Sequence, residues 1–278
     1  MNVTTQVDGA PQVDGAPPIV IRKMGFSFED LPRHWFGGDP IRTHVINGLH
    51  FVFPAGERFF IRSLKPFVDK VSPQLRERIR GFSGQEAHHQ AEHRRAFKAI
   101  EAQGYDVQSF LAWYEKLAFE TIEPCVSPLS RLATTAALEH YTAVLGELVL
   151  ATDTLNDCHP LMRELLMWHA CEEIEHKSVT FDVLQHIDPR YRTRVGGFVI
   201  GTTVLFLFWG AGIRHMLVQE PRDEIPKSTR QALTVLSSTL SHLIPRALDY
   251  LRPSFHPNDH DNYALARAYL EEIGRLDA

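Results

Sequence analysis

Two segments of the 278-residue chain carry the same pattern, a glutamate followed three residues later by a histidine. The two pairs are Glu86/His89 and Glu173/His176. Residues three apart share one face of a helix, so each pair can bind one metal ion from one side. One pair alone is weak evidence in a chain with 15 histidines and 34 acidic residues. Two pairs on separate helices constrain the fold, because both helices must face the same centre.

Two further glutamates lie in apolar stretches. Glu57 sits in an aromatic run, 51–61, and Glu139 follows a run of small and apolar residues, 132–138. A buried and unpaired carboxylate costs several kcal/mol, so each position requires a cation or a proton. In chain order the set is Glu57, Glu86/His89, Glu139 and Glu173/His176. This order is the ligand set of ferritin-like di-iron and di-manganese bundles. Solvated surface charge is the ordinary interpretation of one pair, but for all four segments together we favour a metal site.

Two more histidines lie one helical turn from these pairs, His93 after His89 and His169 before Glu173. From the residues alone, either one is a seventh ligand or a hydrogen-bonding partner of a ligand. His88 and Glu175 lie about 100° around the helix from the adjacent ligands. We expect these two to hydrogen-bond to ligands or to face solvent. Beyond the metal ligands the sequence identifies no catalytic residue and no site for an organic cofactor.

The rest of the sequence is helical in character, because alternation with period two is missing over long stretches. Ser–Pro and His–Pro pairs mark helix starts, and glycine or a following proline marks the ends. The expected helices cover about 41–64 with a kink or restart at Pro54, 72–103, 106 to before Pro124, 127–156, and 159 to before Pro189, with two more near Pro226 and Asp259. We predict an all-α protein, a ferritin-like four-helix bundle with additional C-terminal helices.

The expected domain organisation has three parts. Residues 1–18 contain a repeated Gln-Val-Asp-Gly-Ala-Pro hexapeptide, which cannot bury a face, and are predicted to be a flexible tail without a secretory signal. Residues 19–188 form the metal-binding bundle. Residues 189–278 form a C-terminal helical extension that includes an apolar helix at 195–213.

The segment 195–213 has no charged residue and just reaches the length that spans a bilayer. Gly197 and Gly201 would let another helix approach closely in lipid or in protein. We favour a helix that is buried against the bundle or in a dimer interface slightly over a helix that spans a membrane. Attachment to a membrane surface ranks between these two interpretations.

Composition restricts partners and compartment. The net charge of -5 gives no basic signature for nucleic acid. The three cysteines, Cys125, Cys158 and Cys171, are too few and too scattered for a disulfide framework or a cysteine-based zinc site. We therefore predict a cytoplasmic protein, with membrane association left open. Its expected partner is a small-molecule substrate, and a homodimer is left open.

The residues around the proposed ligands resemble a bacterial family of predicted metal-dependent hydrolases with a ferritin-like core. The resemblance covers about residues 32–188. It rests on four blocks: His34-Trp35, Phe53-Pro54-Ala55-Gly56-Glu57-Arg58-Phe59-Phe60, Gly84-Gln85-Glu86-Ala87-His88-His89 and Glu172-Glu173-Ile174-Glu175-His176-Lys177. The spacing is also similar to that of di-iron arylamine N-oxygenases, which carry a third histidine one turn before the last Glu-x-x-His. That similarity implies the ligands Glu57, Glu86, His89, Glu139, His169, Glu173 and His176, with His93 as the rival seventh ligand.

The ligand types suit iron or manganese, and our main prediction is a di-iron enzyme that activates O2 to oxidise a small organic substrate. Such an enzyme requires two iron ions, or manganese in their place, O2 as co-substrate and an electron donor. The alternative is a metal-dependent hydrolase that uses a metal-bound hydroxide. A non-catalytic metal-binding protein is the third and least favoured interpretation.

Overall fold

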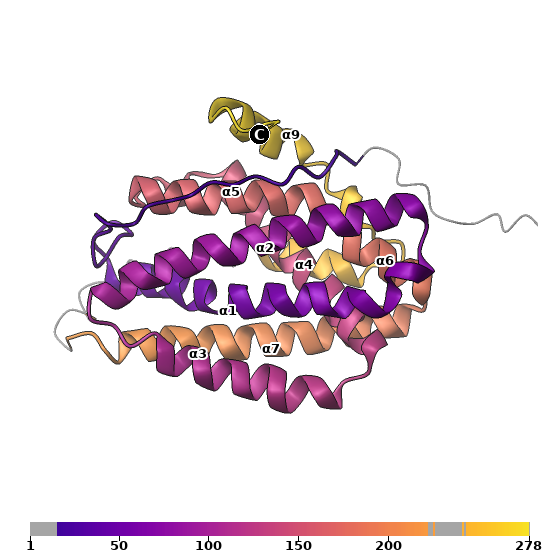
Figure 1. Ribbon diagram of the computed structural model, residues 1–278, viewed down its shortest axis with the longest axis horizontal. Coiled ribbons are helices and arrows are strands. Elements are labelled where there is room, and N and C mark those ends of the chain that lie inside the picture. The colour runs from indigo at the N-terminus through magenta and orange to yellow at the C-terminus, as the bar shows by residue number, and fades with distance from the viewer. Residues whose placement is uncertain (1–15, 222–224, 226–240, 242, 278) are drawn as a thin grey trace, which may run out of the picture.

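The computed structural model describes residues 16–221, 225, 241 and 243–277. Within these residues the chain forms eight α-helices and no strand, which confirms the predicted all-α class. Four long helices form the bundle that carries the candidate ligands: α1 (Pro40–Leu64), α2 (Pro73–Ala102), α4 (Pro128–Ala151) and α5 (Pro160–His176). They run side by side along the long axis of the molecule (Figure 1). A helical bundle is therefore observed, and its ferritin-like character stays a prediction.

Side-chain caps start the bundle helices where the sequence predicts. The Ser72 hydroxyl accepts from the Leu75 amide at the start of α2, and Ser127 accepts from Ser130 at the start of α4. In both helices proline follows the cap, where its missing N–H costs nothing. α1 continues through Pro54 without a restart.

Three predicted helices differ from the observed ones. α4 ends at Ala151 rather than near residue 156, and a short 3-10 turn follows. The single helix expected from 159 to before Pro189 is divided into α5 and α6 (Val179–Ile187). At the break the ammonium of Lys177 is buried and donates to the His260 carbonyl and the Asn262 side chain, which ties this point to the C-terminal segment. α3 (Gln108–Glu115) continues as a π-helical turn over Lys116–Ile122.

The apolar helix is α7 (Tyr191–Leu217), and it packs along α1 and α4. A β-carbon added at Gly197 would lie 2.3 Å from the Ala133 carbonyl, so the two backbones are in direct contact there. The opposite face exposes Val199, Phe206 and Leu207. Our expectation of a helix buried in protein therefore holds for one face only. Among the described residues α7 is the one helix long and apolar enough to cross a membrane, and 28% of its apolar 18-residue stretch is buried inside the protein.

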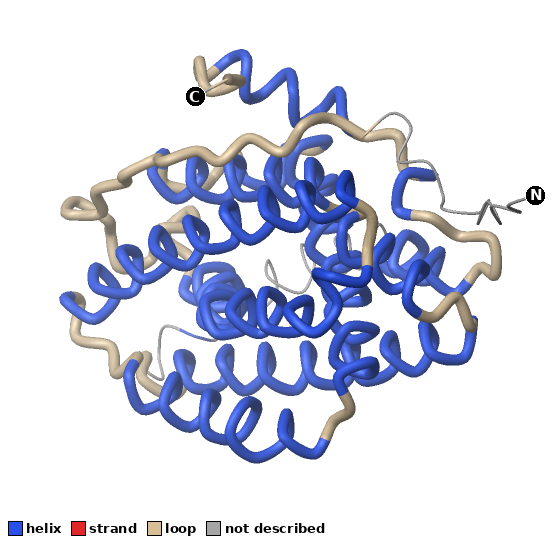
Figure 2. Tube along the Cα trace, turned by 45° about the vertical axis from the view of Figure 1, so that its right-hand side comes forward, coloured by secondary structure: helices blue, strands red, loops and turns tan. Residues whose placement is uncertain are grey.

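An extended N-terminal strap, residues 16–36, crosses α2 and α5 (Figures 1 and 2). α9 (Tyr263–Glu272) packs on α5 from the same side and is the helix predicted near Asp259. The tail predicted at 1–18 lies largely outside the described residues, as does the helix predicted near Pro226.

The candidate ligands occupy a polar layer between apolar layers of the bundle. On α2, the apolar core residues Leu75, Ile79 and Phe82 precede this layer, and the buried Ala96 and Phe97 follow it. On α1, Ala55 and Phe59 flank Glu57 in the same way. The polar layer is therefore sealed from solvent on both sides along the bundle axis.

Candidate metal centre

The seven side chains predicted as ligands all lie in this polar layer, and all are buried. α1 supplies Glu57, α2 supplies Glu86 and His89, α4 supplies Glu139, and α5 supplies His169, Glu173 and His176. Their donor atoms form two groups, within each of which the atoms lie within 4.8 Å of one another. The groups are Glu57/His89/His169 and Glu86/Glu139/Glu173/His176. The structure therefore brings the whole predicted set together as two adjacent half-sites.

Two carboxylates join the half-sites. Glu173 Oε1 lies 2.8 Å from His169 Nε2, and its Oε2 lies 3.3 Å from His176 Nε2. Glu86 does the same, with Oε2 3.8 Å from His89 Nδ1 and Oε1 3.3 Å from His176 Nε2. Each carboxylate thus presents one oxygen to each half-site, an arrangement that suits two neighbouring cations.

Six carboxylate oxygens of this cluster have no hydrogen-bond partner. They are both side-chain oxygens of Glu57, Glu86 and Glu139, and the Nδ1 atom of His89 is also unpartnered. Buried polar groups are nearly always hydrogen-bonded, because desolvation without a partner is costly. So many unpartnered acceptors around one point fit a site built for cations.

The hydrogen bonds of His89 direct a lone pair into the cluster. Its Nε2–H donates to the Glu172 carboxylate at 3.0 Å. Its Nδ1 therefore carries the lone pair, and this atom lies 3.6 Å from Glu173 Oε1 and 3.8 Å from Glu86 Oε2. A carboxylate behind the outer ring nitrogen is the usual arrangement for metal-binding histidines.

Gln85 fixes His176 in the same way. The Gln85 amide NH2 donates to the Glu175 carboxylate and to the Val20 carbonyl, so its Oε1 is left to accept. That oxygen accepts from His176 Nδ1–H at 2.9 Å. His176 Nε2 then faces oxygens of three carboxylates, Glu86, Glu139 and Glu173, each 3.3 Å away. A nitrogen that faces three acceptors requires a cation or a proton between them.

His169 points into the cluster and not to solvent. Its Nε2 faces Glu173 and, at 3.8 Å, Glu57. Its Nδ1 bonds to His93 Nε2 at 2.8 Å, and His93 Nδ1 lies 3.3 Å from His50 Nδ1. His93 therefore holds the outer nitrogen of His169 and does not face the half-sites as a rival ligand.

Before any cation binds, burial and repulsion raise the pKa of three of the four carboxyl groups, whereas His176 and His169 lower the pKa of Glu173 despite its burial. Burial raises the pKa of Glu86 and of Glu139 to about 8. Burial and the neighbouring carboxylates raise the pKa of Glu57 well above its usual range. Burial lowers the pKa of His169, which favours the neutral imidazole that a metal ligand must be. The carboxylates of Glu173 and Glu139 raise the pKa of His176 despite its burial. In the absence of metal, protons therefore occupy Glu57, Glu86, Glu139 and His176, and cations compete with these protons.

The strap supplies a buried arginine behind the cluster. Arg22 is 1% exposed and donates to both oxygens of Glu175 at 2.8 Å and to Glu172 at 3.1 Å. The indole N–H of Trp168 also donates to Glu172. Arg22 thus holds both carboxylates in place. Glu172 orients His89 directly, and Glu175 orients His176 through Gln85.

Sequence reasoning missed Arg22, Gln85 and Glu172. The last two lie beside the predicted ligands, in the blocks that carry the family resemblance, and that adjacency was the available signal. Glu175, expected near a ligand or at the surface, is buried and paired with Arg22. His140, next to Glu139, points elsewhere and donates to the carbonyls of the 246–247 backbone.

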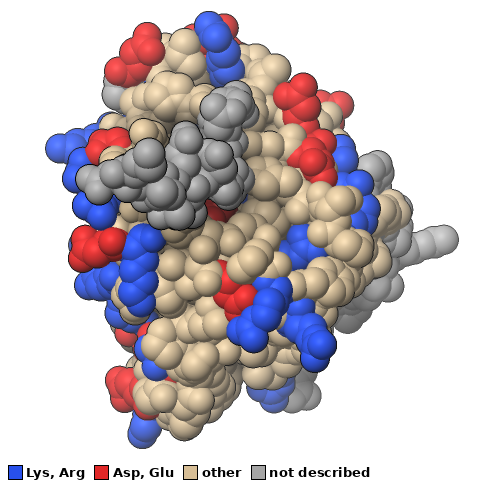
Figure 3. All heavy atoms as spheres, turned by 90° about the vertical axis from the view of Figure 1, so that its right-hand side faces the viewer, with Lys and Arg blue, Asp and Glu red and all other residues tan. Residues whose placement is uncertain are grey.

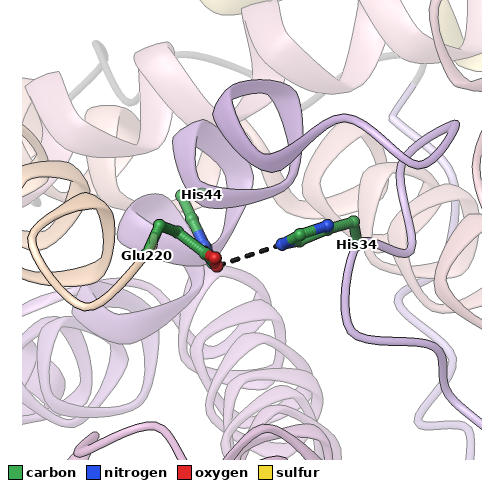
Figure 4. Close-up of side chains that lie close together, drawn as sticks. All are labelled: His34, His44 and Glu220. Carbon is green, nitrogen blue, oxygen red and sulfur yellow. Dashed lines mark hydrogen bonds and ion pairs between the residues drawn. The ribbon is translucent and has the colours of Figure 1, made fainter. Parts of the chain in front are cut away.

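A second group of possible ligands provides a contrast. His34 and His44 point with their Nε2 atoms to one oxygen of Glu220, at 3.0 and 2.6 Å (Figure 4). The Trp35 indole donates to Asn47 Oδ1, so the Asn47 amide NH2 must donate to His44 Nδ1. His44 Nε2 therefore carries the proton that it donates to Glu220. This group is a hydrogen-bonded network, whereas in the bundle centre six carboxylate oxygens and Nδ1 of His89 have no hydrogen-bond partner.

A family model described as predicted metal-dependent hydrolase matches residues 20–261. No curated protein and no solved structure matches the chain. The match confirms the resemblance to the hydrolase family that the sequence blocks indicate.

Our main functional prediction, a di-iron oxygenase that activates O2, is contradicted by this match and was wrong. The hydrolase that we kept as the alternative is supported instead. O2 as co-substrate and an electron donor are no longer required. The physical reason for the error is that carboxylates and imidazoles in this arrangement bind the divalent ions of a hydrolase as well as those of an enzyme that activates O2. The count of histidines therefore did not distinguish the two reactions.

Proposed function

The chain belongs to the family of predicted metal-dependent hydrolases, and on this basis we propose that its buried cluster binds two divalent metal ions and hydrolyses a small organic substrate. The observation that carries the proposal is the set of unpartnered carboxylate oxygens facing inward-directed histidine nitrogens. Four carboxylates would balance the charge of two divalent ions. This mixed oxygen and nitrogen donor set, without thiolate, suits iron or manganese.

The half-sites divide the ligands. Glu57, His89 and His169 would hold one ion, and Glu139 and His176 the other, with Glu86 and Glu173 shared between them. When bound, the ions lower the pKa of a water molecule and polarise the substrate bond that the water attacks. The protein contributes fixed ligand positions, because the outer nitrogen of each histidine is already held by a hydrogen bond.

Aromatic rings close the cluster. Phe53 lies edge-on to His169 with ring centroids 5.0 Å apart, Phe82 to His176 at 4.8 Å, and Trp168 to His89 at 5.0 Å. These rings restrict rotation of the imidazoles and exclude bulk water. Charge interactions are stronger in such a dry site than in solvent.

Metal analysis of the purified full chain tests this proposal. We expect two metal ions per chain in the wild type. In Glu139→Ala the number of bound ions should fall to one or none per chain. Glu77→Ala removes an exposed carboxylate of α2 and should keep the wild-type content. Ester and amide substrates tested under anaerobic conditions should be hydrolysed, with the activity lost on chelation and restored by metal. Unchanged metal content in Glu139→Ala, or hydrolysis that survives metal removal, would contradict the proposal.

Contact with a lipid surface through the exposed apolar face of α7 is a further part of this proposal. A helix that meets the length and composition of a span supports it. We expect the wild-type chain to sediment with lipid vesicles. A variant with polar residues in place of Phe206 and Leu207 should stay in the supernatant.

A further inference from the structure

An apolar cavity of about 110 Å³ lies beside the polar layer, between α1, the π-helical turn 116–122, α4 and α7. A single water needs only about 10–15 Å³ measured in this way, so the space exceeds a packing defect. Its walls are mainly aliphatic and aromatic, including Leu49, Val52, Leu145, Val204 and Phe208. Such a lining gives water few hydrogen-bond partners and favours an apolar occupant.

The cavity adjoins the candidate metal centre through the side chain of Phe53. Phe53 lines the cavity, and its ring is also in edge-on contact with His169. Gly56 and Phe60, which line the cavity as well, lie one residue before and three residues after Glu57. On the facing helix Leu138 lines the cavity immediately before Glu139. A molecule in the cavity would therefore pass alongside the level of Glu57 and Glu139, which falls between the ends of the lining on α1 and on α4.

The shape of the cavity favours a linear occupant. Its wall on α1 extends from Leu49 to Phe60, twelve residues whose eleven steps rise by about 16 Å. On α4 the lining extends from Arg131 to Leu145. A groove that is long relative to its volume accepts an extended chain better than a compact ring system.

Charged residues surround the outer end. Glu123, Arg131 and Phe119 line both the cavity and a second hollow at the surface, which Arg58 and Arg62 also line. The arginines are paired there, Arg62 with Glu123 at 2.6 Å. On this end of the molecule acidic and basic side chains are mixed around uncharged surface (Figure 3). The cavity is therefore polar at its mouth and apolar along its length, and it passes the acidic layer part-way along, at Phe53 and Leu138.

We propose that this cavity binds the alkyl chain of the substrate, so that the enzyme acts on an acyl compound whose hydrolysable carbonyl lies next to Phe53 and Glu57. This inference rests on the proposed function for its reaction. For an ester, the oxygen of one water bonds to the acyl carbon, the bond from that carbon to the ester oxygen breaks, and a proton from the water passes to the departing alcohol. The products are a carboxylic acid and an alcohol.

Binding of unbranched saturated fatty acids with 4 to 14 carbons tests the proposal without turnover. The metal-loaded full chain is titrated with each acid, and displacement of a fluorescent fatty acid gives Kd. We expect Kd to fall about fourfold for each added methylene until the cavity is filled, and then to level off.

Three variants locate the binding. Val204→Phe shortens the cavity, so Kd should level off at a shorter chain, whereas Leu145→Ala enlarges it and should move the plateau to a longer chain. Val218→Phe places the same phenylalanine at an exposed position just after α7, away from the cavity, and should leave the series unchanged. A Kd independent of chain length, or equal plateaus in Val204→Phe, Leu145→Ala and Val218→Phe, would overturn the proposal.

The two proposals fail separately. If the chain-length series behaves as expected but no ester of any length is hydrolysed, the cavity assignment stands and the hydrolase proposal fails. If esters are hydrolysed and neither their rates nor fatty-acid binding depend on chain length, the hydrolase stands and the cavity assignment fails.

Discussion

The replacement Arg22→Met tests whether the strap supports the candidate metal centre. The guanidinium is almost fully buried and bonds to Glu175 through two parallel N–H donors, and to Glu172 through one of them. Methionine has a similar length and no charge. The variant therefore leaves two buried carboxylates without their cation while changing the packing little.

The expected loss of stability follows from that geometry. Removing one partner of a buried ion pair costs about 3–5 kcal/mol, because the remaining charge is left without compensation. For a chain of this size each kcal/mol lowers the melting temperature by about 2–4 °C. We therefore predict that Arg22→Met melts about 6–20 °C below the wild type in a thermal denaturation experiment.

The same variant should weaken metal binding. Glu172 holds His89, and Glu175 holds Gln85, which in turn holds His176. Losing groups that orient metal ligands typically costs about 10–100-fold in metal affinity. Competition with a chromophoric chelator measures this change directly.

Two further variants complete the experiment. Lys23→Met removes the adjacent, exposed cation and should melt with the wild type. Arg22→Met combined with Glu175→Gln should recover part of the loss, because one of the two stranded charges is gone. A melting temperature of Arg22→Met within about 1 °C of Lys23→Met would refute the reasoning.

The remaining predictions concern packing, histidine orientation and pH. Gly197→Val should lower the melting temperature strongly, because its β-carbon would overlap the Ala133 backbone. Gly196→Val should change it little, because a β-carbon there meets no atom within 4 Å. His93→Ala should weaken metal binding in a chelator competition, and His88→Ala should not. In chelator-treated protein the pKa of Glu86 is raised from 4.5 to about 8, so the folded state binds the extra proton. The melting temperature should therefore fall between pH 5 and 8, and saturating metal should suppress that fall.

That the candidate ligands lie together was predictable from sequence because the rules for it are local, whereas their binding of metal stays a prediction. A Glu-x-x-His pair fixes one face of α2 and of α5, and a Ser–Pro cap fixes where α2 and α4 start. The role of Arg22 was not predictable, because 150 residues separate it from Glu172. The break after α5 was missed for the same reason, since the partners of Lys177 lie more than 80 residues away.

The strap also implies an order of events during synthesis of this protein. Besides its carboxylates, Arg22 donates to the backbone carbonyls of Arg275 and Leu276, so its full set of acceptors spans more than 250 residues. At about 5–20 residues per second, a ribosome completes residue 275 about 5–20 s after His176. During that interval all seven candidate ligands have been synthesised, but the arginine that steadies them lacks its last acceptors. Metal loading in the cell is therefore expected to follow, rather than accompany, synthesis of the bundle helices.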